Sequence, residues 1–255
     1  MWSILQGRLL PPELGYQETP ENWKQEFESL KTVNLDQIEW VITKKRELNN
    51  PFFFENISYY PISVVCADNA IDKNIFTKNF FKEKIYPIFE RCEKVGVKTV
   101  AIPLLEDSKI DSIEKKKIII ERLIESCNNF KNININIEAE IDSHTLKDIV
   151  NCHERIKITY DTGNLTALNF NHELYIKEVF DKITNVHLKD RKFNYGPSKK
   201  LGEGDTNFDL IFKTLSSLGY NKTFTLQIAR DDEGDEINYI KKTTKDLRGI
   251  HEKYF

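Results

Sequence analysis

Four strand-like stretches of the sequence each carry, near their end, a side chain that can bind a metal ion. Each stretch alternates apolar and polar residues, so the polar ones share one face of a strand. The stretches are Asn134 to Glu140, Ile156 to Asp161, Ile183 to Arg191 and Thr223 to Arg230. Their candidate ligands are Glu138, Asp161, His187 and Gln227. Two carboxylates, one imidazole and one amide oxygen favour Mn, Mg or Co over Zn, and we predict a site for one divalent cation.

The order of the remaining elements predicts how these side chains meet. Further strands are expected at 2–9, 35–41, 62–66 and 99–104, and helices at 21–31, 74–95, 109–130, 146–150, 173–180, 207–218 and 236–253. Segment 44–58 fits a short irregular helix or a loop that plugs one end. Eight strands separated by helices or long loops predict an α/β fold, a (β/α)8 TIM barrel forming a single domain over 1–255. An open doubly wound sheet is the alternative, but no G-x-G-x-x-G motif follows the first strand.

Composition narrows the class of protein. The net charge of −3 gives no basic excess, so we expect no nucleic-acid partner. The four cysteines form no C-x-x-C pair, which fits free thiols in a reducing compartment. Arg8 interrupts the short apolar N-terminus, and no apolar run reaches the roughly 18 residues of a membrane span. We therefore expect a cytoplasmic protein with no membrane partner.

Several motifs resemble those of one known family. They are I-N-I-E at 135–138, Y-D-T-G-N at 160–164, N-V-H-L-K-D-R at 185–191, L-G-E-G-D-x-N-F at 201–208, L-Q-I-A-R at 226–230, Q-G-R-L at 6–9 and L-D-Q-I-E-W at 35–40. Together they resemble the xylose isomerase-like TIM barrels, the sugar phosphate isomerase/epimerase group. The resemblance implies a barrel that binds one divalent metal through Glu138, Asp161, His187 and Gln227. It also implies a small-molecule sugar or sugar phosphate as substrate, a proton moved beside its carbonyl, and a homodimer as one open option.

Two positions depart from the family pattern. Gln227 stands where the better-studied epimerases have a second glutamate, and an amide neither accepts nor returns a proton. Asn164 stands where related barrels, including the endonuclease IV group, have a histidine. The His-rich three-metal site of that group is therefore not expected, since His144, His153, His172 and His251 fall on or beside predicted helices.

The chemistry that the resemblance implies needs three parts. A bound cation polarises the carbonyl as a Lewis acid. A base removes the adjacent hydrogen, and Glu138 is the first choice, with Glu140 or Glu39 behind it. The catalytic candidates are Glu138, Gln227 and Lys189, and the substrate-binding candidates are Asn164, Arg191, Arg230, Arg8, Glu140 and Glu39. Cationic rim residues suit a phosphate or carboxylate, and the amides of Gly202 and Gly204 are a further candidate anion site.

The sequence leaves the reaction type open. With Gln227 in place of a second acid, a one-base isomerisation through a cis-enediol is the simpler mechanism, while epimerisation needs another residue. β-Elimination of water would use the same groups. Two other functions remain: a sugar-binding barrel that has lost catalysis, and a metal-dependent hydrolase of phosphoesters or abasic nucleic acid. The missing histidines and the acidic charge speak against the hydrolase.

Overall fold

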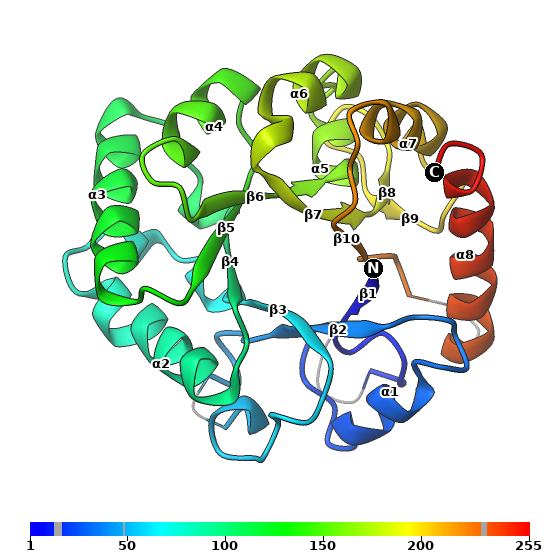
Figure 1. The fold of residues 1–255 in the computed structure, drawn as a ribbon, viewed down its shortest axis with the longest axis horizontal. Helices are drawn as coiled ribbons and strands as arrows, with labels where there is room; N and C mark the ends of the chain where they lie inside the picture. The colour runs from blue at the N-terminus through cyan, green and yellow to red at the C-terminus, as the bar shows by residue number, and fades with distance from the viewer. Residues whose placement is uncertain (13–16, 48, 231–233) are drawn as a thin grey trace.

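A closed barrel of parallel strands forms the centre of the computed structural model, which describes residues 1–12, 17–47, 49–230 and 234–255 (Figure 1). Within these residues the order around the barrel is β1-β10-β7-β6-β5-β4-β3-β2. The strands are β1 (Trp2–Leu5), β2 (Gln37–Val41), β3 (Ile62–Cys66), β4 (Thr99–Leu104), β5 (Asn134–Ala139), β6 (Ile156–Asp161), β7 (Ile183–Leu188) and β10 (Thr223–Leu226). The predicted TIM barrel is confirmed, and the open sheet is wrong.

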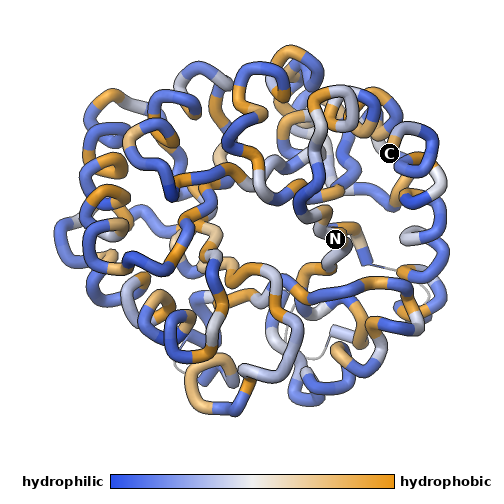
Figure 2. Tube along the Cα trace, in the orientation of Figure 1, coloured by the Kyte–Doolittle hydropathy of each residue, from blue (hydrophilic) through white to orange (hydrophobic). Residues whose placement is uncertain are grey.

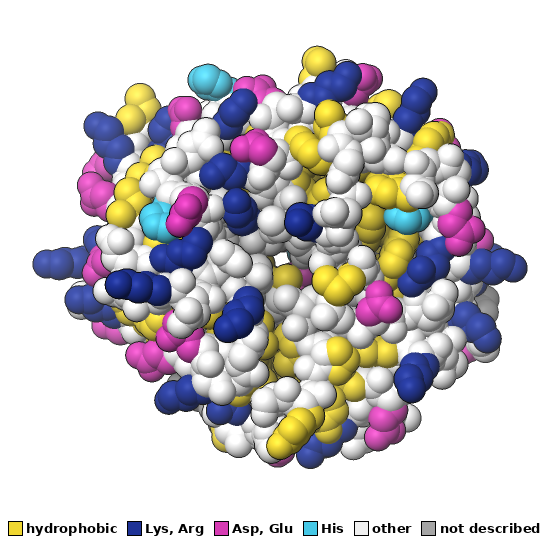
Figure 3. Space-filling view, in the orientation of Figure 1, with side chains coloured by type: hydrophobic (Ala, Val, Ile, Leu, Met, Phe, Trp, Pro, Cys, Tyr) yellow, Lys and Arg dark blue, Asp and Glu magenta, His cyan; other side chains and the backbone are white. Residues whose placement is uncertain are grey.

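Helices surround the barrel and cover its outer face (Figure 1), and many charged side chains lie around the outer edge of the molecule (Figure 3). They are α1 (Trp23–Ser29), α2 (Tyr86–Val95), α3 (Ile113–Asn129), α4 (Ser143–Val150), α5 (Thr162–Ala167), α6 (His172–Val179), α7 (Phe208–Ser217) and α8 (Glu236–His251). Short helical turns are η1 (Pro51–Phe53), η2 (Asp68–Ala70), η3 (Lys73–Phe76), η4 (Phe81–Ile85), η5 (Glu106–Ser108) and η6 (Phe180–Lys182). Hydrophobic and hydrophilic residues alternate along these outer helices (Figure 2), as expected where one face packs on a core. None of the described helices is long and apolar enough to cross a membrane.

Several predicted boundaries are wrong for identifiable reasons. The predicted helix 74–95 is regular only from Tyr86, because Pro87 lacks an N–H and disturbs the turn before it, which is the π-helical η4. The first strand ends at Leu5, since Gly7 turns the chain with a φ of 79°. In segment 44–58, of which residue 48 lies outside the described part, η1 forms and Phe52 packs on Trp40.

The stretch 183–191 also differs from the prediction. It leaves the barrel after Leu188, and Asp190–Arg191 form the separate strand β8, which pairs antiparallel with β9 (Ser198–Lys199). The helix α5 that directly follows β6 was not predicted. Asp161 caps it by accepting a hydrogen bond from the backbone N–H of Asn164, so the strand end and helix start share one residue.

The barrel interior is divided into an apolar and a polar part. Its apolar part is built by side chains from four neighbouring strands, β1 to β4: Leu5, Val41, Val64, Cys66 and Ala101. The polar part holds buried Asn136, Thr159, Asn185 and Thr225, which are joined by hydrogen bonds. Each candidate ligand on β5, β6 and β7 therefore follows one of these polar residues by two positions on the same strand.

Candidate metal and active site

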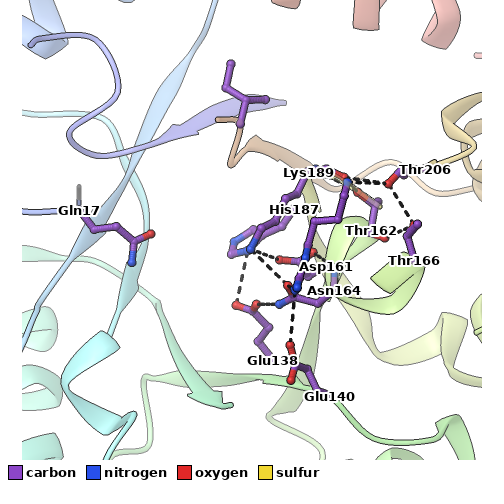
Figure 4. Close-up of polar contacts among 12 residues, drawn as sticks. Gln17, Glu138, Glu140, Asp161, Thr162, Asn164, Thr166, His187, Lys189 and Thr206 are labelled. Atoms are coloured by element: carbon purple, nitrogen blue, oxygen red, sulfur yellow. Dashed lines mark hydrogen bonds and ion pairs between the residues drawn. The ribbon is translucent and has the colours of Figure 1, made fainter. Parts of the chain in front are cut away.

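The structure brings three of the predicted ligands together at the carboxyl ends of adjacent strands (Figure 4). Glu138 lies on β5, Asp161 on β6 and His187 on β7, and their ligand atoms all lie within 4.8 Å of one another. All three side chains are buried. Gln227 directly follows β10, and its backbone N–H still donates to the carbonyl of Leu188, the last residue of β7. The four predicted ligands thus come from four consecutive strands of the barrel.

The donor atoms of this cluster fit a divalent cation. Asp161 Oδ2, His187 Nδ1 and Gln227 Oε1 are buried atoms with no hydrogen-bond partner among the described residues. Buried polar atoms are otherwise almost always hydrogen-bonded, so these three atoms require an explanation. Two of them belong to the ligand cluster, and Gln227 follows the strand beside β7. Carboxylate, imidazole and amide donors are the ligand types that divalent cations accept. A cation at the cluster would satisfy Asp161 Oδ2 and His187 Nδ1, and Gln227 stays the predicted fourth ligand.

Glu39 is the hydrogen-bond partner of His187 inside the barrel. Both oxygens of Glu39 lie close to His187 Nε2, at 3.1 and 3.0 Å, and Oε2 also accepts from Asn185 Nδ2 at 2.9 Å. Glu39 is fully buried, so it faces the imidazole and not the substrate space that we predicted. A proton on Nε2 leaves the lone pair of Nδ1 pointing toward Glu138, whose Oε2 is 3.5 Å away. Glu39 lies on β2 and His187 on β7, which are not neighbouring strands, so only the closed barrel reveals this contact.

The cluster holds more negative charge than its own cations balance. Burial lowers the pKa of His187, but the charge and hydrogen bond of Glu39, with Glu138 and Asp161, raise it to about 9. Burial raises the pKa of Glu138 to about 8, with the charge of Asp161 adding to the shift and that of His187 opposing it. Both raised pKa values favour the protonated forms of Glu138 and His187, as expected where buried carboxylates lie close together. A bound divalent cation would replace those protons.

Asn164 links the cluster to the cationic rim residues. Its Nδ2 donates to Glu138 Oε1 at 3.0 Å, and its Oδ1 accepts from Lys189 Nζ at 3.2 Å and from Arg191 Nη1 at 3.0 Å. Lys189 Nζ also lies 3.8 Å from Asp161 Oδ2. Arg191 Nη1 lies 3.9 Å from Glu140. The structure therefore groups Asn164, Lys189, Arg191 and Glu140 beside the ligands.

The hydroxyls of Thr162, Thr166 and Thr206 fix the backbone that carries Lys189. Thr162 Oγ1 lies 2.8 Å from the carbonyl oxygen of Lys189 and 3.0 Å from its N–H, and Thr206 Oγ1 lies 3.3 Å from the same carbonyl. Thr166 contacts Thr206 and His172 (Figure 4 shows the threonines). Gly163 makes room for the side chain, because a Cβ there would meet Lys189 Cγ at 2.7 Å.

The Gly-rich loop after β9 binds the protein's own carboxylate. Asp190 is buried and accepts from the backbone N–H groups of Gly202 at 2.8 Å, Gly204 at 2.9 Å and Thr206 at 3.1 Å. A Cβ on Gly204 would lie 1.8 Å from Asp190 Oδ1. The prediction that these amides receive an anion from the substrate is therefore wrong, since Asp190 already occupies them. The signal in the sequence was an acidic residue at the strand end, ahead of two glycines.

Two predicted substrate ligands contact the protein's own rim. Arg230 donates to the carbonyls of Gly7 and Leu10 and pairs with Glu236 at 3.3 Å. Arg8 is buried and donates through Nε to the carbonyl of Ile228 at 3.2 Å. Both guanidiniums thereby join the loop after β1 to the segment after β10.

The fold and the site together define a barrel whose buried carboxylates and imidazole converge at the carboxyl end of the strands. The chain belongs to the xylose isomerase-like TIM barrel family, whose model matches residues 69–248. It is 26% identical to the inosose isomerase of Bacillus velezensis over 191 residues, which are 66% of this chain and 67% of that protein. An uncharacterized protein of Methanocaldococcus jannaschii, MJ1614, is 27% identical over 128 residues, 46% of this chain and about half of its own length, 50%.

Solved structures share the fold over almost the whole chain. The IolI protein, crystallised with a zinc atom bound, matches with a TM-score of 0.74 at 18% identity, over 100% of this chain and 99% of that one. The 3-keto-D-glucoside 4-epimerase YcjR of E. coli matches with a TM-score of 0.72 at 15% identity, over 97% of this chain and 98% of its own. At these identities the structural likeness establishes the fold.

Proposed function

We propose that this protein is a divalent-metal-dependent isomerase or epimerase of a sugar or sugar phosphate. The observation that carries the proposal is the buried cluster of Glu138, Asp161 and His187, in which Asp161 Oδ2 and His187 Nδ1 make no hydrogen bond to a described residue. Membership of the xylose isomerase-like family and similarity to an inosose isomerase support the substrate class. A fold alone does not define a reaction, so the site has to carry the assignment.

Glu138, Asp161, His187 and Gln227 would hold the cation. A bound cation supplies Lewis acidity, which polarises a substrate carbonyl and acidifies the neighbouring C–H. The oxygen-rich donor set favours Mn, Mg or Co, and Zn is compared with them because the IolI protein carries zinc. Glu39 orients His187 for this role by holding Nε2, as carboxylates commonly do for metal-binding histidines.

Glu138 is the proposed base. Asn164 donates to its Oε1 and so orients the carboxylate that would take a proton from the substrate carbon. Lys189 lies beside Asp161 and Asn164, where its charge can stabilise negative charge that develops on the substrate oxygen. Arg191 and Glu140 lie next to Asn164 and would contact the remainder of the substrate. We assign Arg8 and Arg230 to bracing the rim loops.

Solvent deuterium exchange tests this function. The protein with Mn, Mg, Co or Zn is incubated in D2O with D-fructose, D-tagatose, D-ribulose 5-phosphate and an inosose, and NMR follows deuterium at the carbon beside the carbonyl. We expect metal-dependent incorporation into at least one substrate, and its loss in Glu138→Gln with the fold retained. Full activity of Glu138→Gln would contradict the role of Glu138. No exchange with any substrate would favour a binding protein, for which Gln227 is the one supporting feature.

A further inference from the structure

A second cavity lies at the same end of the barrel, on the side away from β6 and β7. Its volume is about 390 Å³, and loops that follow β1, β2, β3 and β4 line it. The lining residues that matter here are Gln17, Glu18, Lys44, Asp68 and Glu106. Figure 4 shows Gln17 across the mouth from the ligand cluster. Gln17 and the neighbouring Asp68 therefore lie on the side of the mouth that faces a substrate bound at the cluster.

Asp68 lies at the same end of the barrel as Glu138. It follows the last residue of β3 by two positions, where the chain turns into η2, while Glu138 lies near the end of β5. Asp68 is hydrogen-bonded to Gln17, and Figure 4 shows Gln17 across the mouth from Glu138. The Gln17–Asp68 pair therefore lies at the mouth, apart from the proposed base.

The surroundings of Asp68 suit a proton donor. Gln17 Nε2 donates to its Oδ1 at 3.3 Å, and Arg8 in turn donates to Gln17. Burial raises the pKa of Asp68 to about 6, the charges of Glu18 and Glu106 add to the shift, and Lys44 opposes it. Burial raises the pKa of the Cys66 thiol, and the charges of Glu39, Asp68 and Glu138 raise it further. Cys66 is therefore a neighbour that Asp68 and Glu138 share inside the barrel.

We propose that Asp68 is the second proton-transfer residue, acting on the substrate face opposite to Glu138, and that the enzyme therefore inverts a stereocentre beside a carbonyl. This inference rests on the proposed function and chooses epimerisation over one-base isomerisation. It also explains how the protein can dispense with an acid at position 227, since Asp68 would supply the proton that the Gln227 amide lacks.

The step balances as a pair of proton transfers. The Glu138 carboxylate takes the proton from the carbon beside the carbonyl, and the electrons of the broken C–H bond enter the enediolate. The Asp68 carboxylic acid then gives its proton to the opposite face of the same carbon, and a new C–H bond forms as the carbonyl returns. Glu138 ends protonated and Asp68 ionised, and exchange with water restores both. No oxidant or further reactant is needed.

Asp68→Asn tests the inference, because an Asn oxygen still accepts from Gln17 while the donated proton is lost. The probe is the sugar that takes up most deuterium with the native enzyme, out of D-fructose, D-tagatose, D-ribulose 5-phosphate and an inosose. We expect epimer formation to fall by about 100-fold or more, while deuterium still enters the unconverted substrate at a near-native rate through Glu138. Glu138→Gln should lose both signals.

Glu106→Gln is the matched control, since it neutralises a carboxylate in the same cavity. It should retain epimer formation but lower the pKa of Asp68, and so move the alkaline limb of the pH profile to lower pH. Epimer formation by Asp68→Asn within about threefold of native, or equal loss of exchange and epimer in that variant, would overturn the inference. If the native enzyme exchanges deuterium into no sugar, the proposed function falls and takes the inference with it.

Discussion

Replacing Asp190 with alanine should destabilise the protein by about 3 kcal/mol. The carboxylate accepts three backbone hydrogen bonds, and each hydrogen bond to a charged group contributes about 1.5 kcal/mol or more to the free energy of unfolding. Loss of all three would therefore cost roughly 4.5 kcal/mol. Gly202 is exposed, and Gly204 and Thr206 are partly exposed, so water recovers part of that energy. For a chain of this size about 3 kcal/mol corresponds to a fall in Tm of roughly 6–12 °C.

Asp190→Asn provides the graded comparison. One amide oxygen can replace Oδ2, which accepts from Gly202 and Gly204, but the NH2 group then faces the N–H of Thr206. We expect a cost of about 1–2 kcal/mol for this variant. Urea unfolding followed by fluorescence and circular dichroism measures both values. Coincident transitions are also expected, because we propose that residues 1–255 form one domain.

The outcome that refutes this reasoning is an alanine variant within about 0.5 kcal/mol of the native protein. The loop amides would then not depend on Asp190, and a cradle for a substrate anion would again be open. Equal stabilisation of the native protein and of the alanine variant by inorganic phosphate would point the same way.

Three further predictions test separate parts of the protein. Burial lowers the pKa of His172 to about 4, so the unfolded chain takes up a proton at this residue first as the pH falls below about 6.5. The free energy of unfolding should therefore fall between pH 6.5 and 4, by about 2 kcal/mol from pH 7 to 5. Urea unfolding at a series of pH values should show a smaller loss in His172→Gln. Gly163→Ala should push Lys189 aside and lower turnover by about tenfold or more, while cation binding persists. Gly249→Ala is the control and should leave turnover unchanged, because a Cβ there meets nothing within 4 Å. Equal turnover in both variants would refute the positioning of Lys189. Gln227→Glu should tighten cation binding by about tenfold in calorimetry, and an unchanged affinity would remove Gln227 from the ligand set.

The sequence predicts most of the barrel because alternation and helix periodicity are local patterns. The stretches around Glu138, Asp161 and His187 become β5, β6 and β7, and their convergence follows from barrel closure alone. The short ribbon of β8 and β9 was missed, since Asp190 and Arg191 continue the strand-like composition of β7 although they pair elsewhere.

Side-chain partners were predicted less well because they depend on contacts distant in sequence. Glu39 was assigned to the substrate, yet it meets His187, 148 residues away along the chain. Asp190 was not singled out, although its partners follow within the same loop. A pattern of residue types does not distinguish a carboxylate that meets solvent from one that meets the protein's own amides or imidazole.

The most direct test of the central claim is the number of divalent cations bound by Asp161→Asn. In this variant the amide oxygen can still cap α5 by accepting from Asn164, while an NH2 group replaces the unpartnered Oδ2 that faces the cluster. We predict one bound cation per native chain by elemental analysis after loading with Mn, and none in Asp161→Asn with its circular dichroism unchanged. A native chain without a stoichiometric cation, or a variant that binds it as the native protein does, would contradict the account.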